Sequence, residues 1–181
     1  MFSRKLNPGL ELRQLQPADA RALFAVVDAH RAKLRAWLPW VDATVNPADT
    51  ENYIAGTLRD FAATRAYTCG IWADERLVGV IGQNRIDWAN RIAFPFYWLS
   101  PEAEGRGIMT QCFRAVIDDA FTQLQVRQVV IAVATGNLRA QKIPLRLGFQ
   151  QVSVLKKAEW LYDHHVDHFV YSLAAPKGGT R

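Results

Sequence analysis

The sequence is poor in cysteine and has no long apolar run. Its two cysteines, Cys69 and Cys112, stand far apart, and no CxxC pair is present. This usage, with no apolar stretch before Leu10 that resembles a secretion signal, indicates a reduced, cytoplasmic setting rather than a disulfide framework. Charged residues interrupt every apolar stretch before it reaches the roughly 20 residues that cross a bilayer, so we expect no membrane span.

Glycine and proline are also modest, at 11 and 8 of 181 residues, which excludes collagen-like and low-complexity chains. A hydrophobic share of 50% suffices for a packed core. We therefore expect one domain over residues 1–181, with a core of about 9–173 and frayed ends, including the tail from Pro176. The net charge of +5 admits an anionic partner. Without a known motif or a dense Lys/Arg stripe, we expect no nucleic acid.

Apolar spacing predicts both strands and helices along the chain. Pro95 lacks an N–H donor and predicts a bulged or splayed strand, and the apolar run 126–133 predicts a strand buried on both faces. The predicted strands cover 10–15, 67–73, 77–86, 92–99, 126–133, 149–155 and 167–173. The predicted helices cover 17 to about 40, a segment from 47, 107–124, and 137–147 before Gly148. This order indicates an α/β (α+β) sheet covered by helices.

Two glycines mark a candidate phosphate site between a predicted strand and a predicted helix. Gly105 and Gly107 flank Arg106 just before the helix. Glycines let backbone N–H groups approach an anion, and a helix start adds free donors and a positive dipole end. The third glycine of a dinucleotide fingerprint is missing, because Thr110 stands there. The alternative is that the two glycines only shape a turn.

A second segment makes the phosphate interpretation more specific. The run from Asn137 to Phe149 resembles the second signature of the GCN5-related N-acetyltransferase (GNAT) superfamily, and 102–107 resembles its acetyl-CoA pyrophosphate loop, although Glu102 replaces the usual Gln or Arg. The resemblance spans about residues 9–173 and implies a mixed, splayed central β-sheet flanked by helices on both faces. The chain is most similar to the Rim-type branch of ribosomal-protein-serine N-acetyltransferases, through segments 34–40, 97–99, 105–111, 158–160 and 167–171.

The resemblance also implies which residues hold the cofactor, acetyl-CoA (CoA). A backbone N–H near Trp98 is expected to bind the thioester oxygen. Arg106, Arg139 and Lys142 are candidates for added charge on the phosphates. The expected cofactor-binding residues are Tyr97, Trp98, Leu99, Gly105, Arg106, Gly107, Ile108, Met109 and Asn137.

Acetyl transfer needs a base for the acceptor amine, which must lose a proton before it attacks. Glu159 aligns with the acidic residue considered the base in the similar enzymes, and the alternative is a surface glutamate paired with nearby lysines. The resemblance places Trp37, Trp40 and Asp167 near the acceptor groove. The tryptophans also fit ordinary core positions, and Asp167 also fits a structural role.

The usual proton donors to the leaving thiolate are absent. Pro144 stands where many GNAT enzymes carry a tyrosine, and Ala140 stands where the ribosomal-serine enzymes carry a serine. A thiol pKa near 8.5 lets the thiolate leave and take its proton from water. Tyr171, Ser100 and a group of the substrate are the alternatives.

Histidines near the C-terminus suggest a metal site, because His164, His165 and His168 accompany two aspartates. Strand alternation would divide these side chains between two faces, so we expect no metal. Cys112 lies on the apolar stripe of a predicted helix and is expected to be a buried hydrophobe.

These observations favour an acetyl-CoA-dependent N-acetyltransferase that moves an acetyl group to a primary amine by direct transfer in a ternary complex. The preferred acceptor is a protein N-terminus, as in ribosomal protein acetylation. Two alternatives remain: a small-amine acceptor such as a polyamine or amino sugar, and a non-catalytic acyl-CoA-binding module. A homodimer is compatible with the sequence.

Overall fold

The computed structural model describes residues 3–176, so the expected fraying of 177–181 lies outside the described residues. Within them an eight-stranded sheet has the order β1-β2-β3-β4-β5-β6-β8-β7. Neighbouring strands pair antiparallel except β5 and β6, which are parallel. The strands are β1 (Ser3–Asn7), β2 (Leu10–Gln14), β3 (Tyr67–Ala73), β4 (Arg76–Asp87), β5 (Ile92–Leu99), β6 (Gln128–Ala134), β7 (Gln150–Leu161) and β8 (His164–Ala174).

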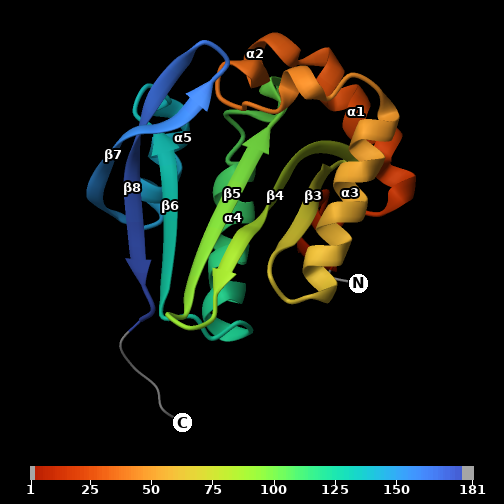
Figure 1. The fold of residues 1–181 in the computed structure, drawn as a ribbon. Coiled ribbons are helices and arrows are strands. Elements are labelled where there is room, and N and C mark those ends of the chain that lie inside the picture. The colour runs from red at the N-terminus through yellow and green to blue at the C-terminus, as the bar shows by residue number, and fades with distance from the viewer. Residues whose placement is uncertain (1–2, 177–181) are drawn as a thin grey trace.

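Helices cover both faces of the sheet, as predicted (Figure 1). One hydrophobic cluster joins α4 to the sheet around Phe113 and Tyr171, and another joins α1, α2 and α3 to the opposite face around Ile54 and Trp98. The helices are α1 (Ala20–Ala29), α2 (Arg31–Arg35), α3 (Pro47–Ala62), α4 (Ile108–Thr122) and α5 (Leu138–Arg146), with short turns η1 (Pro17–Asp19), η2 (Val41–Ala43) and η3 (Pro101–Ala103). Among the described residues no helix is long and apolar enough to cross a bilayer.

The sheet opens between β5 and β6, which lean apart toward their C-terminal ends (Figure 1). The two strands pair only at Ile92↔Gln128 and Ala93↔Val129. The parting begins where Pro95 removes a backbone donor, and β4 has a register shift between Gln83 and Arg85 opposite this point. The predicted splay at Pro95 is therefore confirmed.

Three predicted elements differ from the observed ones near the N-terminus and in β6. The helix predicted to reach about Trp40 ends at Ala29, because the next residue, His30, has φ −126°, and only the short α2 follows. Pro39 disfavours helical backbone at Leu38, so no helix continues. β1 was not predicted, because its apolar pattern is weak. In β6, Val129, Ile131 and Val133 are buried but Ala132 is exposed, so one face is covered rather than two.

The C-terminal strands are longer than predicted. β7 extends to Leu161 and β8 begins at His164, so the segment around Glu159 belongs to a hairpin rather than a loop. A bulge between Leu155 and Glu159, with Lys157 at φ +50°, interrupts the pairing. This irregularity and the exposure of nearly all of β7 hide the strand period in the sequence.

Candidate active site

A groove of about 900 Å³ lies along the C-terminal half of β5, on the side of α4 and α5. Its walls come from α2 and the loop after it, the C-terminal half of β5, the start of α4, and α5. The groove brings together all the predicted cofactor residues except Arg106. Its lining includes Trp37, Tyr97, Trp98, Leu99, Gly105, Gly107, Ile108, Met109, Asn137, Arg139 and Lys142.

The two glycines of the loop adopt the left-handed backbone that favours glycine. Gly105 has φ +79° and Gly107, the N-cap of α4, has φ +75°. A Cβ built on either residue meets nothing within 4 Å, so the backbone there faces open space. The first N–H groups of α4 have no intrahelical acceptor. The loop can therefore cradle an anion such as a pyrophosphate, with no Cβ in the way.

Positive side chains line the same groove from α5. Arg139, Lys142 and Arg146 follow one another along the helix, and Arg139 is paired with Glu104 of the loop. Arg146 was missed by the sequence analysis, although its spacing of four residues from Lys142 puts both on one helix face. These cations favour a phosphorylated ligand.

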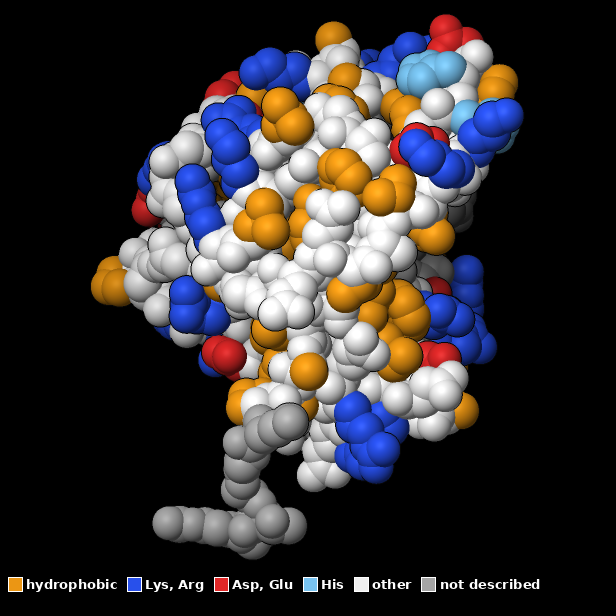
Figure 2. Space-filling model, turned by 90° about the vertical axis from the view of Figure 1, so that its left-hand side faces the viewer, with side chains coloured by type: hydrophobic (Ala, Val, Ile, Leu, Met, Phe, Trp, Pro, Cys, Tyr) orange, Lys and Arg blue, Asp and Glu red, His pale blue; other side chains and the backbone are white. Residues whose placement is uncertain are grey.

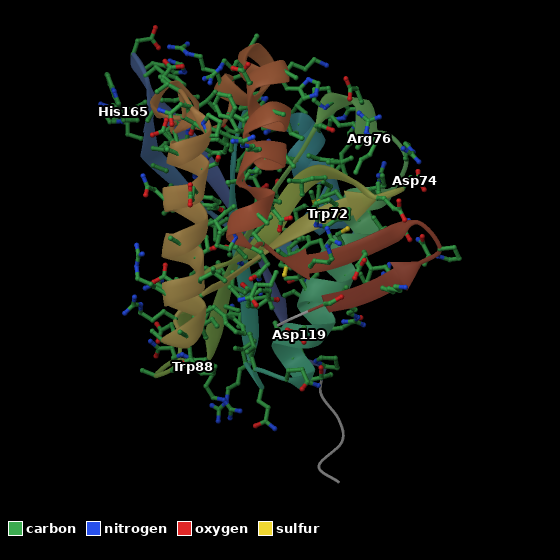
Figure 3. The ribbon with its side chains drawn as sticks, turned by 90° about the vertical axis from the view of Figure 1, so that its right-hand side faces the viewer. Trp72, Asp74, Arg76, Trp88, Asp119 and His165 are labelled. Carbon is green, nitrogen blue, oxygen red and sulfur yellow. The ribbon has the colours of Figure 1, made fainter. Side chains whose placement is uncertain are left out.

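Arg106 turns away from the groove. Its Nη2 lies 3.6 Å from Oδ2 of Asp74 in the β3–β4 turn, and it lines a separate cavity of about 410 Å³ behind the loop. Figure 3 shows Asp74 beside Arg76 on this side of the molecule, far from His165. The guanidinium therefore pairs within the protein.

The strand register corrects the expected donor to the thioester oxygen. The N–H of Ser100 donates to the Val78 carbonyl of β4 across 2.7 Å. Backbone donors alternate in direction along a strand, so the Trp98 N–H also points to β4. The N–H groups of Tyr97 and Leu99 point to the opposite side, where β6 has parted from β5. The donor that faces the opening at the end of β5 is therefore that of Leu99, one residue from the predicted one.

Of the remaining predicted residues, Asn137 and Trp37 line the groove and Trp40 does not. Asn137 is the N-cap of α5, and its Oδ1 accepts from the N–H of Ala140 at 3.1 Å. Trp37 is 38% exposed, and its ring lies 3.4 Å from the position of a Cβ on Gly136. Trp40 is half-buried and packs against Trp98 with ring centroids 6.1 Å apart. Trp37 is thus a groove residue, and Trp40 is mainly a packing residue.

The β7–β8 hairpin brings Glu159 to His168. Oε2 of Glu159 lies 3.4 Å from Nε2 of His168, and their side chains are 32% and 16% exposed. Phe169 and Tyr171 face the cluster around α4, so by alternation His168 faces the opposite side, as Trp98 does. The hairpin is tied to the loop after α2, where the Tyr162 hydroxyl donates to the Leu38 carbonyl at 2.7 Å.

Asp167 is engaged inside the hairpin. Its carboxylate accepts from Nζ of Lys156 and from the N–H of Lys157, each at 2.8 Å. These hydrogen bonds, the first from Lys156, lower the pKa of Asp167. Both oxygens accept hydrogen bonds at the bulge that precedes Glu159. The carboxylate therefore does not line the groove, contrary to the prediction. The lysines proposed as partners of Glu159 lie beside Asp167 instead.

The alternative proton donors lie away from the groove. Tyr171 is buried in the core around α4, and Ser100 lines the cavity behind the loop. Cys112 is buried as predicted, and its burial raises the pKa of the thiol to about 12. Neither of the two usual acid positions, Ala140 and Pro144, carries a side chain that can donate a proton.

The histidines do not gather around a metal position. His164 pairs with Asp163, and the ring of His165 lies edge-on to Trp160 with centroids 4.8 Å apart. His side chains appear at one upper corner of the face in Figure 2, among acidic and basic groups. In residues 3–176 no group of three or more His, Cys, Asp or Glu side chains is arranged to hold a metal ion.

Comparison with known proteins agrees with this geometry. The profile of the Acetyltransferase (GNAT) domain matches residues 9–150. YdaF of Bacillus subtilis is 31% identical over 177 residues, which cover 96% of this chain and 95% of YdaF. The ribosomal-protein-serine acetyltransferase of Escherichia coli is 28% identical over 168 residues, covering 93% and 94%. The crystal structure of the microcin C7 self-immunity acetyltransferase MccE with acetyl-CoA and AMP is 26% identical, covers 94% and 95%, and has a TM-score of 0.89. The chain therefore belongs to the GNAT acetyltransferase family.

Proposed function

We propose that this protein transfers the acetyl group of acetyl-CoA to the N-terminal amine of a protein, by direct attack in a ternary complex. The observation that carries the proposal is the groove along the C-terminal half of β5, with a phosphate loop at the start of α4 and a backbone donor at the end of β5. The preference for a protein acceptor is supported by similarity to a ribosomal-protein-serine acetyltransferase over nearly the whole chain.

In this proposal the loop and α5 bind the phosphates of CoA. The N–H groups from Gly105 to Met109 bind the pyrophosphate, helped by the positive end of the α4 dipole. Lys142 and Arg146 line the groove beside them and add positive charge. The parted edges of β5 and β6 leave unpaired backbone groups that suit the amides of the pantetheine arm.

Acetyl-CoA supplies an activated acyl group as a thioester. The Leu99 N–H is placed to donate to the thioester oxygen as negative charge develops there, and one such donor contributes about 3–4 kcal/mol. Glu159 takes the proton of the acceptor ammonium, so that the amine has a free electron pair for attack on the carbonyl carbon.

The leaving thiolate takes its proton from water in this scheme. Pro144 and Ala140 cannot donate one, and Tyr171 and Ser100 lie outside the groove. A thiol with an ordinary pKa near 8.5 is a good leaving group, so the missing acid costs little. We therefore expect the rate to depend weakly on any single acid.

The test is a thiol-release assay with acetyl-CoA and three kinds of acceptor: a peptide with a free N-terminus and no lysine, the same peptide with a blocked N-terminus, and a polyamine. Release with the free peptide alone supports the proposal. Turnover confined to the polyamine assigns a small-amine acceptor. Tight CoA binding, measured by calorimetry, with no release for any amine indicates a binding module.

A further inference from the structure

The buried nitrogen of His168 has no hydrogen-bond partner in the described chain. Nε2 is shielded from solvent, and its neighbour, Oε2 of Glu159, lies at 3.4 Å, outside ordinary hydrogen-bond geometry. Leaving a buried polar atom unpaired is unfavourable, so such an atom needs an explanation. Here the atom faces a carboxylate, and a shared proton between them would satisfy both.

Along the strand direction, the Glu159–His168 pair lies level with the end of β5, which carries the proposed donor to the thioester oxygen. β5 and β6 are parallel and pair at Ile92↔Gln128, and Trp98 and Ala134 each stand six residues beyond that pair. Ala134 pairs in turn with His168 on β8. Adjacent strands lie about 4.8 Å apart, so His168 lies one strand away from the edge of the opening. The exposed Ala132 indicates that no helix covers this face of β6.

We infer that Glu159 and His168 act as one base, in which His168 takes up the proton that Glu159 receives from the acceptor. The inference deepens the proposed function and rests on it. His168 acts through Glu159 and is a positioning residue rather than one that touches the acceptor.

The proton balance of the step is simple. An N–H bond of the acceptor ammonium breaks and an O–H bond forms on Glu159. That O–H bond then breaks and an N–H bond forms at Nε2 of His168, which leaves a carboxylate beside an imidazolium. The imidazolium releases the Nδ1 proton to water, and a tautomer exchange that moves the remaining proton from Nε2 to Nδ1 restores the pair. The neutral amine then attacks, and the second proton lost by its nitrogen balances the proton gained by the thiolate.

Two carboxylates lie near His168 on the hairpin. Asp167 binds Lys156 and the N–H of Lys157, and it acts on His168 through its charge. β6 presents Ala134 opposite the histidine. Glu159 is the carboxylate whose oxygen lies 3.4 Å from Nε2.

The first test needs no turnover. We would record the ring nitrogen and proton resonances of His168 by NMR, in the whole protein and in Glu159→Gln. Loss of the carboxylate should change the Nε2 resonance of His168, because Nε2 faces Oε2 of Glu159 at 3.4 Å. His165 is the control, and its resonances should stay unchanged. An unchanged Nε2 resonance for His168 would overturn the pairing.

The second test separates a proton role from a structural one. His168→Gln should lower kcat for a peptide N-terminus about tenfold at pH 7 and leave the KM for acetyl-CoA within twofold. The pH dependence of kcat/KM should also differ between wild type and His168→Gln, which a purely structural role would not cause. His165→Gln should behave as wild type. A His168→Gln enzyme with the wild-type rate and profile would disprove the inference.

The two tests also keep the two proposals apart. If wild type transfers acetyl to no amine, the proposed function fails, while the NMR comparison still decides whether the two side chains interact. If wild type acts on the peptide, and the rate and pH profile are the same in His168→Gln, the proposed function stands and this inference fails.

Discussion

The hydroxyl of Tyr97 donates to the backbone carbonyl of Ala140 across 3.0 Å and so ties β5 to α5 in the wall of the groove. Within a helix this carbonyl would accept from the N–H four residues later, but that residue is Pro144, which has none. The tyrosine therefore supplies the donor that the proline lacks. Pro144 removes the usual acid of the family and also creates a carbonyl that needs a partner from another element.

Tyr97→Phe should lower the free energy of unfolding by about 1–2 kcal/mol, because the Ala140 carbonyl loses its donor. Urea unfolding measures this change. The matched background is Pro144→Ala, which restores a backbone N–H four residues after Ala140. In the Pro144→Ala background, Tyr97→Phe should lower the free energy of unfolding clearly less. An equal loss of stability in both backgrounds would show that the hydroxyl does not replace the missing N–H.

Gly107→Ala should weaken CoA binding more than it weakens the fold. A non-glycine residue at φ +75° costs about 1–2 kcal/mol, and its Cβ would also enter the open space where we place the pyrophosphate. Calorimetry should show CoA affinity at least tenfold lower. Gly148→Ala is the control, because Gly148 has φ +86° with equally open space but lies outside the groove lining. Equal affinity losses in both variants would argue against the loop as the phosphate site.

Asp167→Asn should reduce stability in a pH-dependent way. Folding lowers the pKa of Asp167, so its carboxylate stabilises the native state above the unfolded value of about 4, and this stabilisation disappears as pH falls through the lowered native value. The difference in free energy of unfolding between wild type and variant should be constant near neutrality and should vanish below about pH 4. Urea unfolding from pH 7 to 3 measures it, and a gap that grows in acid would contradict the assignment.

Tyr162→Phe should loosen the hairpin that carries Glu159. The change removes the hydroxyl that donates to Leu38 but keeps the ring beneath Arg35, whose guanidinium carbon lies 3.8 Å from the ring centroid. A lost hydrogen bond of this kind costs about 1 kcal/mol. Steady-state kinetics should show the acceptor KM raised about threefold and the acetyl-CoA KM unchanged. A change confined to the acetyl-CoA KM would place the hairpin on the cofactor side.

Local sequence was sufficient to predict structural features that depend on neighbouring residues. Gly105 and Gly107 before a helix, Asn137 at the start of α5 and Gly148 at its end follow from backbone requirements that these residues satisfy by themselves. Pro95 likewise predicted the opening of the sheet, because a missing donor is a property of one residue. The predicted helix 17–40 was too long, because the apolar spacing continues past His30 whereas the helical backbone ends before it.

Only the tertiary structure decided how side chains from different strands meet. The side of β5 that carries the Leu99 donor depends on its register with β4, and the meeting of Glu159 with His168 depends on a bulge that shifts β7 against β8. A shift of one residue reverses the direction of every side chain and amide, so spacing in the sequence cannot fix such contacts. The sequence by itself determined the glycine loop before α4, the opened sheet and the family. The folded register decided which amide of β5 faces the opening and brought Glu159 to His168.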